Sequence, residues 1–440
     1  MQTLYDLNLH CFSEKNCKEA MEAQNSIKDE SVFNALLQKS RPLLVETYED
    51  IDPLIPRCIS ALRRARAPEC YHKHGTFFDH LVGVYRALEC WNVPHSVARC
   101  GLFHSAYSNS IVNLAIFKPD IDRQVVRDLI GSEAEELVHM YCIVPRIELT
   151  YDMVLGKYTD KELVADLEES ENFLSSFDVG NCSRSITYDG WRKKLQGVLP
   201  PEGIVVKHFR TGDDLIIPRR LVALFLLLTM ADLSEQMFGY VDVLFDNENG
   251  RLDSKGNTWK ALWPGDGKPG LWMNAVSRMG AVYTLIAREE KIFRKDEEKK
   301  FGFEHIELTI PPVFNNCTTV FNPSDQIQAR DLYWEAICNR GDKTDEAEAL
   351  LLKACVHNPF IGEPHLVLAQ IYLSGEKYEE AEKEAKIGLK LLLEWGSNWD
   401  KRTSWEGWIS WGRVMLDKAK EKTWPKTSWG IINLGFVNEV

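Results

Sequence analysis

The 440-residue chain lacks several short motifs that assign enzymes to a class. It has no GxxxxGK[S/T] loop to hold nucleotide phosphates, no HExxH helix to bind zinc and no GxSxG turn to present a nucleophilic serine. These absences give no support to a P-loop enzyme, a peptidase of the HExxH type or a serine hydrolase. We therefore expect any catalytic residues to come from separate segments that the fold brings together.

Positive charge is in deficit along the chain. There are 52 lysines and arginines against 65 aspartates and glutamates, which gives a net charge of −13 at pH 7. Because a nucleic-acid backbone is bound through a basic surface, this balance argues against nucleic acid as the main partner. A local basic pocket for a small anion is compatible with the same composition.

Ordered cysteine spacing and long apolar runs are also missing. The eleven cysteines are scattered and include no CxxC pair, which argues against a disulfide framework and a zinc ribbon. The longest apolar stretch, LVALFLLLTMA at 221–231, is too short to cross a bilayer. The first thirty residues have no basic segment followed by an apolar core, so no secretory signal is expected. We expect reduced thiols, no membrane partner and a cytoplasmic location.

What the sequence does contain is apolar residues at helical spacing, from about residue 30 to 240. Segments such as IPRCISALRRAR, FDHLVGVYRALECW and EAEELVHMYCIV carry them three or four positions apart, which predicts an all-α fold. A stretch rich in Gly, Asn, Asp and Trp predicts a long loop. The predicted divisions are an N-terminal helical extension at 1–50, a helical metal-binding domain at 51–295 with its loop at 241–270, and a linker at 296–325.

The C-terminal part contains a repeat. Ala347 and Ala381 occupy matching places 34 residues apart, the period of tetratricopeptide repeats. The stretch LVLAQIY supplies the large, small and aromatic residues of such a helix: Leu368, Ala369 and Tyr372. The sequence therefore resembles a tetratricopeptide region, and we expect residues 326–440 to form a helical domain. It either packs on the first domain or recruits a protein partner through residues 326–420.

Four ionisable residues lie on or beside otherwise apolar helices: His74, His80, His104 and Asp232. A single histidine in an apolar helix is more often a core residue than a metal ligand. Asp232 follows the run LFLLLTMA, however, and burying a carboxylate without a partner is costly. It therefore needs a cation, strong hydrogen-bond donors or a metal nearby.

The order of these segments resembles the HD superfamily of metal-dependent phosphohydrolases. The segments are FDHLVGVYRALECW, CGLFHSAYS and LLTMADLSEQM, and the closest likeness is to alarmone hydrolases of the Rel/Spo type. The resemblance covers roughly residues 70–240 and implies a helical bundle around a divalent metal. It assigns His80 as the first ligand, His104 as the histidine of the His-Asp doublet and Asp232 as the last carboxylate, with His74 as a candidate extra ligand.

The sequence departs from this family at the doublet. Ser105 stands where the aspartate belongs, and Ser108 and Asn109 occupy the region of an acidic pair that activates water in the alarmone hydrolases. Serine cannot bridge two ions as a carboxylate does. Two imidazoles and one carboxylate remain, a set that suits a single Zn, Mn or Fe ion with open positions.

Three further residues are candidates for a catalytic role. Ser105 lies within the doublet itself, and Glu235, one turn after Asp232, is a candidate base or water-orienting group; alternatively it faces solvent. Arg146 is a candidate for binding a carboxylate or phosphate of an anionic small-molecule substrate, or for pairing with Glu135 or Glu136.

Three functional classes follow. The first is a divalent-metal-dependent enzyme of the HD type acting on a small molecule, with hydrolysis slightly preferred because it is the commonest chemistry of the superfamily. The second is a non-haem Fe(II) oxygenase, an oxidoreductase, using the same His/His/Asp set. The third is a catalytically inactive HD-like binding or scaffold protein that works through its tetratricopeptide-like region.

Overall fold

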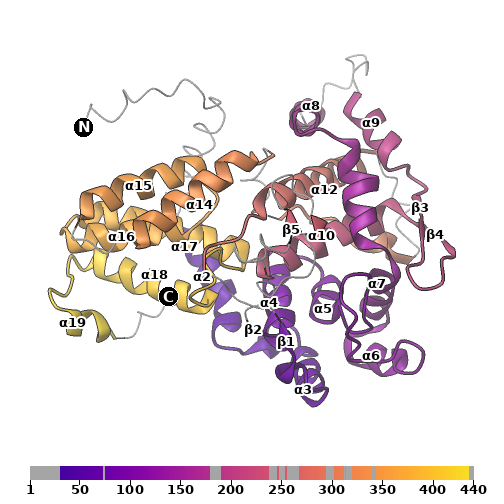
Figure 1. The fold of residues 1–440 in the computed structure, drawn as a ribbon, viewed down its shortest axis with the longest axis horizontal. Coiled ribbons are helices and arrows are strands. Elements are labelled where there is room, and N and C mark those ends of the chain that lie inside the picture. Colours follow the sequence, from indigo (N-terminus) through magenta and orange to yellow (C-terminus); the bar gives the residue numbers. More distant parts are fainter. Residues whose placement is uncertain are drawn as a thin grey trace.

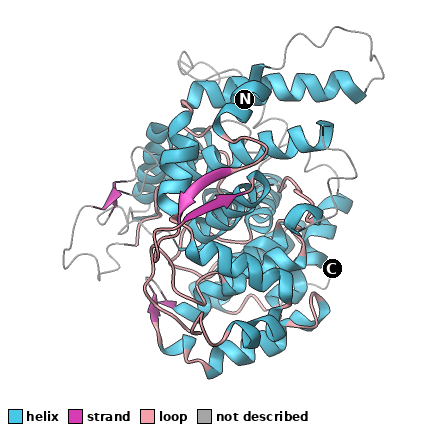
Figure 2. Ribbon diagram, turned by 90° about the vertical axis from the view of Figure 1, so that its right-hand side faces the viewer, coloured by secondary structure: helices cyan, strands magenta, loops and turns pink. Residues whose placement is uncertain are grey.

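The computed structural model describes most of the chain and shows an all-α fold (Figure 1). Strands occur only as short antiparallel pairs within the described part (Figure 2). The ranges that the structure describes are 30–72, 75–178, 190–236, 245–246, 253–254, 267–293, 302–311, 313, 320–338 and 343–435.

The first part of the chain forms a helical bundle with small hairpins. Its leading elements are α2 (Glu30–Leu44), η1 (Tyr48–Asp50), α3 (Ile55–Arg64), η2 (Ala67–Glu69), β1 (Tyr71–His72), β2 (Gly75–Thr76), α4 (Phe77–Cys90), α5 (His95–Phe103), α6 (Arg123–Ile130) and α7 (Ser132–Ile143). They are followed by η3 (Glu148–Val154), η4 (Leu155–Lys157), α8 (Asp160–Asp178), α9 (Gly190–Val198), β3 (Ile204–Lys207), β4 (Asp214–Ile217), α10 (Arg219–Gln236), β5 (Phe245–Asp246), β6 (Asp253–Ser254), α12 (Met273–Phe293) and η7 (Gly302–His305).

Helix α10 is the central element of the bundle. Its sequence is apolar on every side, and all of its residues except Thr229 are buried. A helix that is hydrophobic all round needs neighbours on all faces. It packs against α4, α5 and α12, which carry their own apolar faces. The polar residues at its C-terminal end, from Asp232 onward, are therefore buried among the other helices of the bundle.

Helix α4 begins at a well-defined cap beside the centre of the bundle. The Thr76 hydroxyl accepts a hydrogen bond from the Asp79 backbone N–H, and the Asp79 carboxylate accepts from the Thr76 N–H in return. Such a capping box satisfies two N–H groups that the helix leaves open and fixes where its first turn begins. His80 lies in that first turn, so the cap also sets the position of its imidazole.

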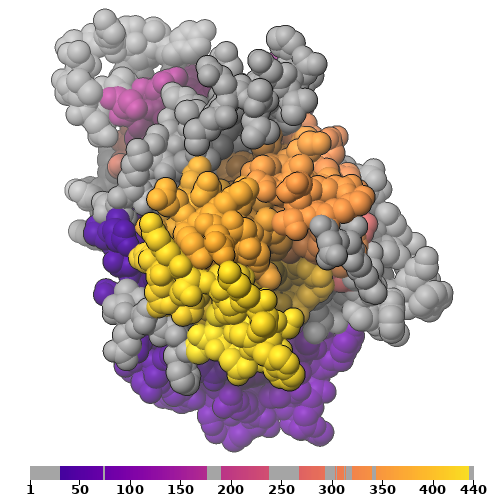
Figure 3. Space-filling model, turned by 90° about the vertical axis from the view of Figure 1, so that its left-hand side faces the viewer, coloured from indigo at the N-terminus to yellow at the C-terminus, as the bar shows by residue number. Residues whose placement is uncertain are grey.

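The C-terminal part is a stack of helices, α14 (Pro323–Cys338), α15 (Thr344–His357), α16 (Glu363–Ser374), α17 (Tyr378–Trp395), α18 (Trp405–Lys420) and α19 (Ser428–Ile432). The pairs α14–α15, α16–α17 and α17–α18 lie side by side in chain order. We refer to residues 323–435 as the C-terminal helical domain. The space-filling view shows its orange and yellow surface directly against the indigo elements of the first part (Figure 3).

The C-terminal helical domain is fastened to α4 at Gly396. This residue ends α17 with a φ of 63°, and an added Cβ would lie 2.7 Å from the Cα of Ala87. Arg86 donates from Nε to the Gly396 carbonyl oxygen at 2.8 Å and its guanidinium lies 4.9 Å from the centre of the Trp405 ring. The close approach of the two backbones explains why glycine occupies this position.

The tryptophans of the C-terminal domain take different places. Trp405 packs under Arg86 of α4, whereas the indole N–H of Trp408 donates to the Asp400 carbonyl within the domain at 2.9 Å. Trp411 packs on Trp424. Part of this aromatic cluster thus joins the two parts of the chain.

Some expected features fall outside the described residues. Most of the predicted loop at 241–270 does, although Phe245–Asp246 and Asp253–Ser254 pair within it as β5 and β6. His74 is also outside the described residues. Across the described ranges no helix has the length and apolar character needed to cross a membrane.

Candidate metal centre

His80, His104 and Asp232 converge inside the bundle. They come from the first turn of α4, the C-terminal cap of α5 and the end of α10. One nitrogen or oxygen atom of each lies within 4.8 Å of the others, and all three side chains are buried. His80 Nε2 is 3.4 Å from His104 Nε2 and 3.3 Å from Asp232 Oδ1. This buried His-His-Asp group could hold a metal ion.

Both imidazoles are oriented through their Nδ1 atoms. His80 Nδ1 contacts the Glu235 carboxylate, and His104 Nδ1 is 2.7 Å from the Gly101 carbonyl oxygen. An Nδ1–H donated to such an acceptor places the remaining lone pair on Nε2 and fixes the ring. The two Nε2 atoms face each other and Asp232. The supporting contacts therefore match those expected around metal-binding histidines.

The electrostatic surroundings separate the two histidines. Burial lowers the pKa of His80, but the carboxylates of Glu235 and Asp232 outweigh it and raise that pKa to about 9. Burial dominates at His104 and lowers its pKa to about 4. The pKa of Asp232 is well below its usual range, because the two histidines and Arg146 outweigh the cost of burying the carboxylate. Protonated His80 in the metal-free protein therefore has one ring N–H directed to each carboxylate, Nδ1 to Glu235 and Nε2 to Asp232.

Arg146 brings a buried positive charge to the centre. Its guanidinium lies 4.3 Å from the centre of the Tyr141 ring and donates to Asn109 Oδ1 at 2.9 Å. Nη1 is 3.5 Å from Asp232 Oδ2, while the buried Nε–H has no hydrogen-bond partner. This N–H is thus available to an acceptor atom of a ligand. The pairing of Arg146 with Glu135 or Glu136, one alternative expected from the sequence, does not occur, because both acids pair with Arg123.

Ser105 is buried beside this arginine. Its hydroxyl oxygen accepts a hydrogen bond from Asn109 Nδ2 at 3.0 Å, and Asn109 in turn accepts from Arg146. Ser105 and Asn109 therefore form a neutral chain that holds the guanidinium. The contact that the structure gives the Ser105 side chain is thus a positioning one, with Asn109.

Glu235 is brought to the site as well, but on the outer side of His80. It is buried rather than facing solvent, and its carboxylate contacts His80 Nδ1. A Cβ added at Gly83 would lie 2.6 Å from Glu235 Cγ, so the side chain is held closely against α4. The glycine leaves the space that this carboxylate needs to reach the imidazole.

Two residues near the ligands were not singled out from the sequence. Gln236 donates from Nε2 to Asp232 Oδ1 and its Oε1 lies 3.0 Å from His72 Nε2. The His72 ring is 4.5 Å from the His80 ring, measured between centres. The segment YHKHGTFFDH contains three histidines, two before α4 and one in its first turn. Their spacing alone did not identify His72 as the one that lies beside His80.

Comparison with known proteins gives one match. The model of a family described as a domain of unknown function, DUF6817, matches residues 61–146. That segment contains His80, His104 and Arg146 but ends before Asp232 on α10, so it covers one part of the site and less than half of the chain. No curated protein and no solved structure matches the chain.

Proposed function

We propose that the chain is a divalent-metal-dependent enzyme of the HD superfamily that acts on an anionic small molecule at a single-ion His80/His104/Asp232 centre. The convergence of these three side chains, with both Nε2 atoms facing the Asp232 carboxylate, is the observation that carries this proposal. The C-terminal helices are proposed to be tetratricopeptide-like.

The chemistry of the donor set fits a catalytic ion better than a structural one. Structural zinc sites have four protein ligands, whereas three leave positions for water and substrate. Each imidazole has an acceptor on Nδ1, so neither ring needs to turn to present Nε2. The ligand pattern alone does not select among Zn, Mn and Fe.

Hydrolysis is the reaction that we favour. An ion held by His80, His104 and Asp232 would lower the pKa of a coordinated water, to about 7 in the case of zinc, and so would supply a nucleophile without a separate base. That property suits a centre in which Ser105 and Asn109 replace the acids of the alarmone hydrolases. Arg146, with its unpartnered Nε–H, is placed to bind a phosphate or carboxylate oxygen of the substrate and to hold it against the centre.

A second candidate is an Fe(II)-dependent oxygenase. Two histidines and one carboxylate are the ligand set by which many non-haem iron enzymes activate O₂. The roles of the chain's own residues are the same: His80, His104 and Asp232 bind, and Arg146 orients an anionic substrate. The two candidates differ in the metal and in the consumption of oxygen.

Metal content tests the proposal directly. The purified chain is loaded anaerobically with Fe, Mn or Zn, desalted and analysed for bound metal. We expect one ion per chain in the wild type, none in His104→Ala and one in the matched control His139→Ala, since His139 on α7 is not among the converging ligands. An unloaded wild type under all three conditions would leave the inactive scaffold as the better interpretation.

Reaction type is read from the loaded protein. Release of nitrophenol from nitrophenyl phosphate esters, lost in Arg146→Gln at unchanged metal content, supports hydrolysis of an anionic substrate. Oxygen uptake by the iron form without any hydrolysis would replace that assignment with the oxygenase.

A further inference from the structure

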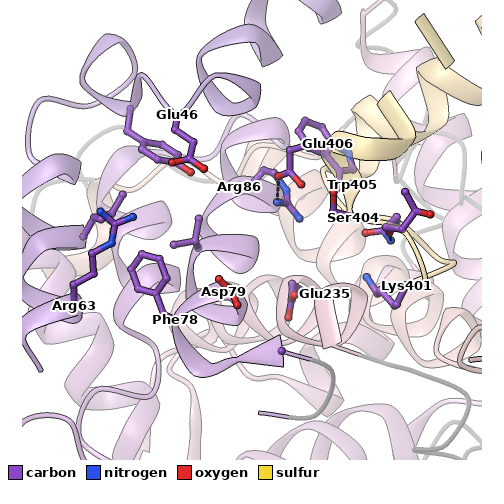
Figure 4. A pocket seen from close by; sticks show the side chains of 16 residues that line it. Glu46, Arg63, Phe78, Asp79, Arg86, Glu235, Lys401, Ser404, Trp405 and Glu406 are labelled. Atoms are coloured by element: carbon purple, nitrogen blue, oxygen red, sulfur yellow. Dashed lines mark hydrogen bonds and ion pairs between the residues drawn. The ribbon is translucent and has the colours of Figure 1, made fainter. Parts of the chain in front are cut away.

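A cavity of about 390 Å³ lies where the bundle meets the C-terminal helical domain (Figure 4). Its walls come from α3 and α4 on one side and from the segment 398–406, which joins α17 to α18, on the other. The volume lies within the range of small-molecule pockets, roughly 300–1,000 Å³. We call it the interdomain cavity.

The interdomain cavity touches the metal centre through one residue. Glu235 lines it and contacts His80 Nδ1, whereas none of the three ligand residues forms part of its walls. The Nε2 atom of His80, on the opposite side of its ring from Nδ1, faces the other ligands. A molecule in this cavity therefore meets the carboxylate that orients His80 and does not meet an ion bound by Nε2.

Two of the charged residues that line the cavity, Arg86 and Glu406, neutralise each other. Arg86 is paired with Glu406 at 2.5 Å, donates to the Gly396 carbonyl and lies over the Trp405 ring. These contacts join α4 to the C-terminal helical domain. Because Arg86 and Glu406 are paired with each other, a ligand would be bound by the other charged residues of the cavity.

Two cations lie toward opposite ends of the view in Figure 4. Lys401 donates one hydrogen bond, to the Ser234 carbonyl oxygen at 2.9 Å, which leaves two of its three N–H donors. Arg63 lies 5.1 Å above the Phe78 ring and makes no ion pair with any residue in the described ranges. Burial lowers the pKa of Lys401 to about 8, so the ammonium is still largely charged at pH 7.

Two carboxylates lie between these cations. Asp79 and Glu235 appear next to each other in the middle of Figure 4, and a third acid, Glu46, also lines the cavity. A purely anionic ligand would be repelled by these acids, and a purely cationic one by Lys401 and Arg63. A small molecule with an ammonium group and a carboxylate complements both.

We propose that the interdomain cavity is an effector site for a small amino-acid-like zwitterion, coupled to the metal centre through the Glu235 carboxylate. The ammonium group lies between Asp79 and Glu235, and the carboxylate accepts from Lys401 or Arg63. The binding half of this inference stands on the cavity alone, while the coupling half rests on the proposed metal centre.

Calorimetric titration of the metal-free full chain with free L-amino acids, each tested singly at pH 7, tests the binding half. We expect at least one to bind, and expect its N-acetyl derivative, which lacks the ammonium, and its methyl ester, which lacks the carboxylate, to bind at least about tenfold more weakly. Absence of binding by every amino acid at millimolar concentration overturns the proposal, as does binding that survives both modifications.

Variants identify the site. Lys401→Met keeps the apolar stem and removes the ammonium, and we expect the dissociation constant to rise about tenfold. Arg63→Gln at the exposed end provides a second variant that does not depend on the packing of Lys401. Lys426→Met, on the surface beside Glu376, is the matched control and should bind as the wild type does. Unchanged binding in both cavity variants places the ligand elsewhere and overturns the assignment.

Metal titration with and without the amino acid tests the coupling. Because coupling is reciprocal, each ligand should change the affinity of the other by the same factor, at least about fivefold. In Val82→Phe, which fills the cavity, that change should vanish while metal binding remains. If no metal binds under any condition, the proposed function fails and the coupling with it, but charge-dependent amino-acid binding still establishes the cavity site.

Discussion

The two parts of the molecule each bury a pair of carboxylates, and the two pairs have opposite surroundings. Asp232 and Glu235 lie at the end of α10, with exposed fractions of 7% and 5%; Glu363 and Asp400 lie in the C-terminal helical domain, at 1% and 0%. Burial alone would rank the second pair above the first as a candidate site. Their partners show why that ranking is wrong.

The C-terminal pair is occupied by the chain itself. Glu363 Oε1 accepts from the backbone N–H groups of Trp399 and Asp400, at 2.5 and 3.0 Å. Asp400 accepts from the Tyr333 hydroxyl at 2.7 Å and from Arg402. These hydrogen bonds fix the segment between α17 and α18 and turn Lys401 and Trp405 toward α4. The pair is structural because its oxygen atoms are used internally.

The carboxylates of the bundle, Asp232 and Glu235, instead contact imidazole groups that can themselves bind a metal. Asp232 lies opposite two imidazole Nε2 atoms, and Glu235 supports one of those rings from behind. The pKa of Asp232 is lowered, whereas burial raises the pKa of Glu363 to about 7. A buried acid thus indicates a candidate metal site when its neighbours are themselves potential metal ligands. It has a structural role when its neighbours are backbone N–H groups.

Replacing one acid in each pair should have the largest effects and tests whether the two pairs differ in role. Four-ligand zinc sites bind with about 10–16 kcal/mol in total, which is roughly 3–4 kcal/mol per ligand. We therefore expect Asp232→Asn, which removes one ligand, to weaken metal binding by roughly several hundred-fold. Asp400→Asn should leave the metal affinity unchanged and destabilise the fold by about 1–3 kcal/mol, because it weakens the hydrogen bonds that the buried carboxylate accepts from Tyr333 and from the partly exposed Arg402. Metal titration and urea unfolding of both variants measure the two effects; the reverse pattern would contradict the assignment of roles.

The raised pKa of His80 predicts how metal binding depends on pH. In the metal-free protein this histidine is protonated below about pH 9, and an ion must displace that proton. The affinity should therefore rise by up to about tenfold per pH unit between pH 7 and 9 and flatten above. Calorimetry in buffers of different ionisation enthalpy counts the released proton. An affinity independent of pH in this range would show that His80 does not bind the ion through the protonated nitrogen.

The contact between Glu235 and His80 provides a smaller test. Glu235→Gln should lower metal affinity about 10–100-fold, the usual cost of losing a carboxylate behind a ligating histidine. Gly83→Ala should act in the same direction without touching any charge, because the new methyl group displaces the Glu235 side chain. The matched control is Gly197→Ala on α9, where an added Cβ meets nothing within 4 Å. If Gly83→Ala and Gly197→Ala had equal metal affinities, Glu235 would have no role in supporting the metal centre.

The sequence predicted the all-α fold because apolar periodicity is local, and α10 was readable as a buried helix from LVALFLLLTMA. It also named His80, His104 and Asp232, since polar residues on apolar helices are few. It could not show that Glu235 turns inward, because that depends on the space left by Gly83 on another helix. The contact of Arg86 with Gly396, and the cavity beside it, arise only when segments more than 300 residues apart meet.

The smallest expected effect concerns the pair that binds nothing. Glu363 has a pKa of about 7 in the fold, above its ordinary value of 4.5, so its contribution to stability is complete below pH 4.5 and is lost as the pH rises through 7. Glu363 should therefore contribute a fall of roughly 2 kcal/mol in the free energy of unfolding between pH 5 and 7. Histidines with shifted pKa values contribute in the same range, so the measured quantity is the difference between Glu363→Gln and the wild type, which should be of this size. Urea unfolding of the metal-free proteins at the two pH values measures it, and the same pH dependence in Glu363→Gln and the wild type would assign the effect to other groups.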